Sequence, residues 1–114
     1  MAEPAIRQIR VGEGRESGPG IRVWTVSGER VTVNYVELQP GAVTKLDQHA
    51  NEQINYVLEG RIEVRLGPDG GICQALERGA TVTVPPHVEH RFRALGGAAA
   101  MLGIISPARV PKPT

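Results

Sequence analysis

The chain has 114 residues, a length that suits one compact domain, and 40% of its residues are hydrophobic, which is enough for one core. Its 13 basic and 12 acidic side chains give a net charge of +1 and are spread along the chain, which argues against nucleic acid and acidic membranes as partners. The apolar runs are too short to span a bilayer, and the N-terminus carries no hydrophobic signal region. Because the single cysteine, Cys73, cannot form an internal disulfide, we expect a cytoplasmic protein.

Short β-rich runs, separated by glycine and proline turns, follow one another along the chain. Eight runs predict strands at residues 21–26, 30–38, 53–59, 61–67, 72–77, 80–85, 89–95 and 98–105. Turn signals at 67–71 and at Gly96-Gly97 are among those that separate them. We expect one all-β domain over 1–114, with an N-terminal arm and flexible loop at 1–20, a barrel or sandwich at 21–105 and an extended tail at 106–114.

Alternation assigns two faces to the strand predicted at 53–59. If Gln53 points inward, Asn55 also does, and the opposite face carries Ile54, Tyr56 and Leu58. That opposite face is apolar, so we expect it to be covered by a second sheet or by another subunit. By the same parity, Phe92 shares the inward face of His90.

Four side chains that can coordinate a divalent metal lie in two segments bounded by glycine. Asp47, His49 and Gln53 belong to the first segment and share parity, so on an extended strand they point to one face; His90 belongs to the second. Neutral imidazoles suit Fe, Zn, Ni or Mn, and Gln53 would coordinate through its amide oxygen. The four residues predict one divalent transition metal per chain.

The spacing of these residues resembles that of the small single-domain cupins. Their first motif, G-x5-H-x-H-x3,4-E-x6-G, is followed at Gly41, Asp47, His49, Gln53 and Gly60. The resemblance implies a jelly-roll β-barrel, also called a double-stranded β-helix, with a metal at the bottom of its open mouth.

The second cupin motif, G-x5-P-x-G-x2-H-x3-N, is matched at Gly79, Pro85 and His90. His87 replaces its second glycine and Ala94 replaces its asparagine. His87 is expected at the rim or the surface rather than as a further ligand.

The first motif departs from the family at two metal positions. Asp47 stands where cupins place a histidine, and Gln53 stands where many place a glutamate. One carboxylate therefore remains, and with His49 and His90 it could form the two-histidine, one-carboxylate set of non-haem iron sites. Two alternatives stay open: Asp47 could accept a hydrogen bond from a ligand without touching the metal, or the site could have lost its metal.

Within the small cupins, the chain most resembles those of pectin degradation, which open unsaturated uronates toward linear keto sugars. The resemblance lies in residues 49–60, 84–91 and 105–109. It implies that Arg109 binds a substrate carboxylate. The aspartate that the family places near the sugar is Gly103 here.

Three functions are consistent with these residues. The first is a metal-dependent lyase, isomerase or cyclase on a small oxygenated or sugar-like acid, in which the metal acts as a Lewis acid and Asp47 or metal-bound water moves a proton. Asp47 and Arg109 would be catalytic, and Asn55, Phe92 and Arg109 would bind substrate. The second is an Fe(II)-dependent dioxygenase, and the third is a binding or sensor cupin without catalysis. The expected partners are a small-molecule ligand and a second copy of the chain.

Overall fold

The structure is a computed structural model that describes residues 3–68 and 71–109. All regular elements of these residues are strands. They are β1 (Arg15–Glu16), β2 (Ile21–Ser27), β3 (Thr32–Leu38), β4 (Glu52–Leu66), β5 (Ile72–Glu77), β6 (Thr81–Val84) and β7 (His90–Ser106). Within this part of the chain, no helix is long and apolar enough to cross a membrane.

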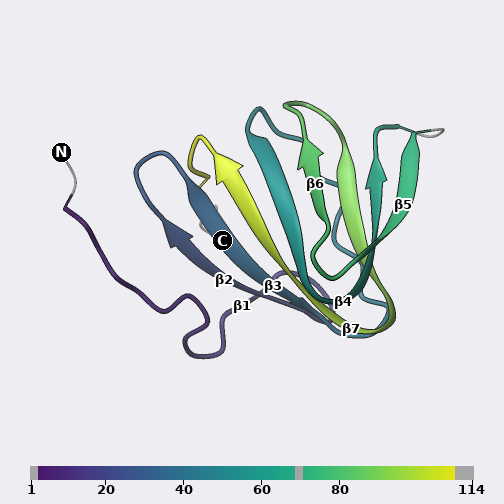
Figure 1. Ribbon diagram of the computed structural model, residues 1–114, viewed down its shortest axis with the longest axis horizontal. Coiled ribbons are helices and arrows are strands. Elements are labelled where there is room, and N and C mark those ends of the chain that lie inside the picture. Colours follow the sequence, from purple (N-terminus) through teal and green to yellow (C-terminus); the bar gives the residue numbers. More distant parts are fainter. Residues whose placement is uncertain (1–2, 69–70, 110–114) are drawn as a thin grey trace.

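Strands β4 and β7 are long and bent, and they pair with each other along most of their length (Figure 1). The ladder shifts register between Val57 and Arg61, where both strands bend. Gly60 lies in this bend with φ 75°, and a Cβ atom on it would lie 2.5 Å from the Ala98 carbonyl oxygen. The bend therefore needs glycine at this position, because any side chain would collide with the facing strand.

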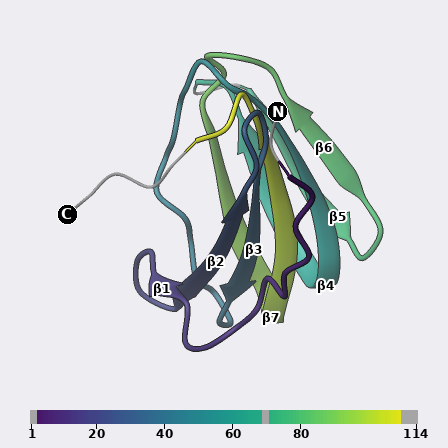
Figure 2. The same cartoon turned by 90° about the vertical axis from the view of Figure 1, so that its left-hand side faces the viewer.

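The bends divide the molecule into two facing walls, joined at the closed end of the barrel (Figure 1). One wall runs β1-β2-β3-β7-β4, with β6 added on β4; the other contains the remaining arms of β7 and β4, with β5 at its edge. The segment 39–51, between β3 and β4, runs along the length of the barrel (Figure 2). Two bridges, Val43 with Arg93 and Asp47 with His90, attach it to β7.

The core lies between the two walls and is apolar toward the closed end. Its members include Ile21, Val36, Leu38, Val57, Ile62, Val64, Phe92 and Met101, each at most 8% exposed. The burial patterns of β4 and β7 place the side chains of Val57, Ile62, Val64, Phe92 and Met101 inside. The predicted all-β jelly-roll barrel is confirmed.

Two predicted breaks between strands were wrong. Residues 53–59 and 61–67 belong to the single strand β4, and 89–95 and 98–105 to the single strand β7. Gly60 and Gly96 adopt positive φ angles and bend the strands without ending them. Part of the arm and loop predicted at 1–20 forms β1, which pairs with β2. Positions 69 and 70 of the predicted turn, and 110–114 of the predicted tail, lie outside the described residues.

The outer face of β4 is open to solvent in the single chain. Ile54 and Tyr56 are each 38% exposed, and the register places them beside Ile104 and Leu102 of β7. Alternation correctly predicted that Ile54 and Tyr56 share one face of the strand. Within the described residues, however, no second sheet covers that face.

Candidate metal centre

Backbone pairing at the mouth brings the two sequence motifs together. The Asp47 amide donates to the His90 carbonyl at 3.0 Å, and the His90 amide donates to the Asp47 carbonyl at 2.9 Å. The His87 amide donates to the His49 carbonyl at 2.7 Å. Segment 39–51 is thus fixed against the start of β7, and the side chains of both motifs meet between the walls.

Asp47, His49 and His90 form a cluster whose possible ligand atoms all lie within 4.8 Å of one another. Two ligands on one ion, each at about 2.1 Å, are at most about 4.2 Å apart, so small side-chain movements would close this cluster around a metal. His90 is 3% exposed, whereas Asp47 and His49 are half-buried. The carboxylate of Asp47 therefore lies near enough to the two imidazoles to share a metal with them after small movements.

Both histidines are oriented through their Nδ1 atoms. His49 Nδ1 contacts the Asn51 carbonyl at 3.0 Å, and His90 Nδ1 contacts the Val88 carbonyl at 3.0 Å. A carbonyl oxygen can only accept, so Nδ1 carries the proton in each ring. The lone pair of the neutral ring then lies on Nε2, which is the orientation that metal-bound histidines take when a carbonyl holds the other nitrogen.

Gln53 presents its amide oxygen to the same cluster. Gln53 Oε1 lies 2.9 Å from His49 Nε2, and Gln53 is 7% exposed. With the His49 proton on Nδ1, this contact places two lone pairs opposite each other, and neither atom donates to the other. A cation coordinated by both atoms would satisfy both lone pairs. The donor set thus fits a transition metal with two imidazoles, an amide oxygen and a carboxylate.

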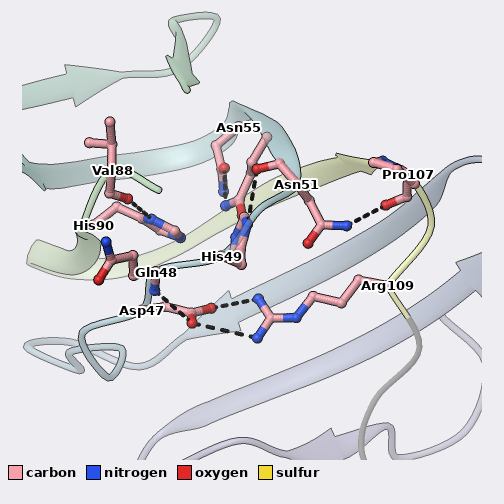
Figure 3. A network of polar contacts seen from close by, with 10 residues as sticks. Asp47, Gln48, His49, Asn51, Asn55, Val88, His90, Pro107 and Arg109 are labelled. Carbon is pink, nitrogen blue, oxygen red and sulfur yellow. Dashed lines mark hydrogen bonds and ion pairs between the residues drawn. The ribbon is translucent and has the colours of Figure 1, made fainter. Parts of the chain in front are cut away.

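Arg109 forms an ion pair with Asp47 at the edge of the cluster (Figure 3). Its Nη1 donates to Asp47 Oδ2 at 2.8 Å, and its Nη2 contacts Oδ1 at 3.5 Å. The backbone of the C-terminal segment is fixed by the Arg109 amide donating to the Thr32 hydroxyl at 2.9 Å, and by Asn51 Nδ2 donating to the Pro107 carbonyl at 2.7 Å. The part of the predicted tail that the structure describes is therefore docked on the mouth.

The surroundings of Asp47 and His90 favour the ligand form of each side chain. Burial alone would raise the pKa of Asp47, but the hydrogen bond and charge of Arg109, with the Gln48 amide, hold that pKa below its usual value. Burial lowers the pKa of His90, and the Val88 carbonyl only partly opposes this effect. At neutral pH, Asp47 is therefore an anion and His90 a neutral imidazole, the forms that bind metals.

The other predicted site residues lie at different depths. Asn55, 2% exposed, sits behind Gln53 and accepts a hydrogen bond from Gln53 Nε2 at 2.6 Å. Phe92 is 3% exposed and packs edge-on to the His90 ring at a centroid distance of 6.1 Å. His87 is exposed, as expected of a rim residue, and its backbone adopts φ 67° where the cupin motif has glycine. Substrate binding by Asn55 and Phe92 stays a prediction.

Sequence reasoning missed the groups that hold the ligands. The carbonyls of Asn51 and Val88 orient the histidines, and every residue has a carbonyl, so composition gives no sign of this role. The pairing of Arg109 with Asp47 was also missed, although both residues had been selected. An acidic residue in place of a histidine, together with a retained arginine, is the signal that could have suggested an ion pair.

The family model described as "Cupin domain" matches residues 34–105, which include all four candidate ligands. The chain belongs to the cupin domain family. This confirms the family that the two motifs indicated. Comparison with curated protein sequences gave no match.

Solved cupin structures resemble this cupin over nearly its whole length. KdgF from Halomonas sp. is 27% identical with a TM-score of 0.84, and the alignment covers 94% of this chain and 96% of that one. It supports the resemblance to the small pectin-degradation cupins. An RmlC-like cupin from Shewanella frigidimarina, 23% identical with a TM-score of 0.82 and covering 94% of both chains, shares the fold. The fold also recurs in Bacillus subtilis oxalate decarboxylase OxdC, 17% identical with a TM-score of 0.81, where 96% of this chain covers 32% of that one.

Proposed function

We propose that this cupin is a metal-dependent enzyme that acts on a small oxygenated acid of the sugar-acid type, as a lyase, isomerase or cyclase. The observation that carries the proposal is the cluster of Asp47, His49 and His90 at the barrel mouth, with ligand atoms within 4.8 Å of one another. The similarity to KdgF and the motif resemblance to the pectin-degradation cupins support an unsaturated uronate as the first substrate to test.

The chain's own residues suggest how such an acid would bind. Two imidazoles, the Gln53 amide oxygen and Asp47 would hold a divalent metal, which would supply Lewis-acid polarisation of a substrate carbonyl or hydroxyl. Arg109 has five N–H donors and directs two of them to Asp47, so the others can bind a substrate carboxylate. The buried ring of Phe92 would form an apolar wall beside His90.

The ion pair with Arg109 allows Asp47 to accept a proton but not to donate one. Because Arg109 keeps the carboxyl ionised, Asp47 can bind a cation or accept a proton, but at neutral pH it has no proton to donate. The proton donor for a reaction at this site would then come from solvent or from the substrate itself.

The test is conversion of an unsaturated uronate by metal-loaded protein under anaerobic conditions, followed by loss of the conjugated absorbance and by product analysis. We expect turnover that chelation abolishes and metal restores. The Arg109→Ala variant should retain metal and lose activity mainly through a higher KM. Absence of turnover on a panel of unsaturated uronates would contradict this substrate assignment.

A second function is favoured by the same cluster. Two histidines and one carboxylate are the ligand set of non-haem Fe(II) oxygenases. Substrate-dependent oxygen consumption that requires Fe(II) would select this function over the lyase or isomerase. Stoichiometric metal without turnover in either assay would favour a binding or sensor cupin.

We also propose that the protein forms a homodimer through the outer face of β4 and β7. The support is the exposed apolar row of Ile54 and Tyr56, which the register continues through Leu102 and Ile104. Light scattering should give the mass of two chains, and Tyr56→Glu should give the mass of one. A monomeric wild-type protein at micromolar concentration would refute the dimer.

A further inference from the structure

A chain of three buried side chains leads away from the candidate metal centre. Gln53 Nε2 donates to Asn55 Oδ1 at 2.6 Å, and Asn55 Nδ2 donates to Met101 Sδ at 3.3 Å. At the other end, Gln53 Oε1 faces His49 Nε2 at 2.9 Å. Gln53, Asn55 and Met101 are 7%, 2% and 3% exposed, so their contacts with one another are not open to bulk water.

The sulfur of Met101 favours one direction of these hydrogen bonds. A thioether sulfur accepts but cannot donate, so Asn55 must turn its NH2 group toward Met101. The Asn55 oxygen then faces Gln53, which must supply its own NH2 group. What remains for His49 and the metal centre is the Gln53 oxygen, the only atom of that amide able to coordinate a cation.

In the metal-free protein each direction opposes one pair of acceptors, Gln53 Oε1 and His49 Nε2 in the direction observed and Asn55 Oδ1 and Met101 Sδ in the reverse. If both amides turned over, the Gln53 NH2 group would face His49, and the Asn55 oxygen would face the Met101 sulfur. The Asn55 oxygen and the sulfur would stay opposed whether or not a metal is bound, whereas a metal coordinated by Gln53 Oε1 and His49 Nε2 relieves the opposed pair in the observed direction. With a metal bound, Met101 therefore favours the direction that turns the Gln53 oxygen toward the metal, although Met101 lies two side chains away from it.

Gly103 leaves Asn55 without a closer acceptor. It lies opposite Asn55 in the β4–β7 register, and a Cβ atom on it would lie 3.4 Å from Asn55 Nδ2. A side chain at this position would lie against the Asn55 amide and could replace Met101 as its partner. With glycine there, the sulfur two residues earlier on β7 is the acceptor that Asn55 reaches.

We propose that Met101 is a positioning residue that, through Asn55, holds Gln53 with its amide oxygen toward the metal centre. This inference rests on the proposed function, because the oxygen has a role only if the centre binds a metal. Met101 is a buried methionine of the core, and under this inference it also orients one ligand of the metal centre.

The test is Co²⁺ affinity, measured by chelator competition and followed by visible absorption, for Met101→Leu in two backgrounds. Leucine nearly conserves volume but offers no acceptor. In the natural background we expect about a 10- to 100-fold weaker Co²⁺ affinity, the range typical of losing a group that orients a ligand. In a Gln53→Glu background, either carboxylate oxygen can face the metal, so Met101→Leu should change the affinity by less than about threefold.

Ile62→Leu is the matched control. Ile62 is 0% exposed, belongs to the same core as Met101, pairs with Ala94 rather than with a residue of the site, and is replaced by a residue of equal volume. It should leave Co²⁺ affinity unchanged in both backgrounds. Equal losses for Met101→Leu in both backgrounds would indicate a packing role and overturn the inference, as would no loss in the natural background.

A measurement on the metal-free protein separates this inference from the proposed function. Side-chain amide NMR should place the Gln53 NH2 protons near Asn55 in the wild type, and Met101→Leu should disturb those signals. If the wild type bound no metal, the proposed function would fail, and the amide spectrum would still decide the direction of the chain. Gln53 NH2 protons found near His49 in the wild type would overturn the inference.

Discussion

The mouth and the closed end of the barrel are built from the same two strands, yet they are held together by different forces. On β4, Gln53 and Asn55 point inward at the mouth and Val57 points inward farther along; beyond the register shift the inward parity changes, and Ile62 points inward. At the mouth, hydrogen bonds and one ion pair join the side chains; at the closed end, apolar side chains pack tightly. The residues that stabilise the fold and those that would bind metal therefore lie on different parts of one strand. Substitutions should be able to remove either property without the other.

The largest effect on folding is expected at the closed end. Ile62 is 0% exposed, and Ile62→Ala should lower the free energy of unfolding by about 2–5 kcal/mol, because it leaves a cavity in the core. Urea denaturation would measure the loss. The protein that remains folded should still bind metal at the wild-type stoichiometry. A folded variant without metal would show that the two regions are not separable.

At the mouth, His90→Ala should weaken metal binding and leave the fold intact, the reverse of what is expected for Ile62→Ala. Removing this buried imidazole deletes one ligand, so metal affinity should fall by at least about 100-fold, while the circular dichroism spectrum and the barrel remain. Metal analysis after dialysis would measure the loss. The surface variant His87→Ala is the control, and it should retain metal. Metal content at the wild-type level in His90→Ala would exclude this residue as a ligand.

Replacing Asp47 by asparagine should lower metal affinity less than His90→Ala does, and it tests whether the Asp47 carboxylate coordinates the metal. The change removes the only carboxylate of the cluster and leaves the Arg109 charge unpaired beside it, so we expect about a 10- to 100-fold weaker metal affinity. The double variant Asp47→Asn with Arg109→Gln removes both charges and should recover part of the loss. Unchanged affinity in Asp47→Asn would place this carboxylate outside the metal's coordination.

Much of this division between the two regions could be predicted from the sequence. Alternation put Gln53 and Asn55 on one face and Ile54 and Tyr56 on the other, as the structure has them. The positions of Gly60 and Gly96-Gly97 were recognised, but their effect was not, because a glycine with positive φ can bend a strand as well as end it.

The contacts behind the candidate ligands could not be predicted in the same way. Met101 and Asn55 are 46 residues apart, and only the pairing of β4 with β7 brings the sulfur to the amide. The ion pair of Arg109 with Asp47 spans 62 residues and depends on where the C-terminal segment docks. Spacing within a motif finds residues on one strand, whereas these partners depend on the register between strands.

The smallest effect is expected from pH in the metal-free protein. The pKa of His90 lies below its usual 6.5 because the ring is buried, so the unfolded chain binds the proton more readily than the folded one. The contribution of His90 to stability is fully present above pH 6.5 and is lost as the pH falls toward the folded-state pKa. Urea denaturation between pH 8 and 5 should therefore show a steeper loss for the wild type than for His90→Ala. Parallel curves would contradict this burial effect.

The central claim is that the polar mouth is a metal centre. Its most direct test is the metal content of wild-type protein purified without chelator or affinity tag and supplemented with Fe, Zn, Ni or Mn. We predict about one tightly bound ion per chain in the wild type and none in His90→Ala, with both proteins folded. A folded wild-type protein without stoichiometric metal after supplementation would contradict the claim.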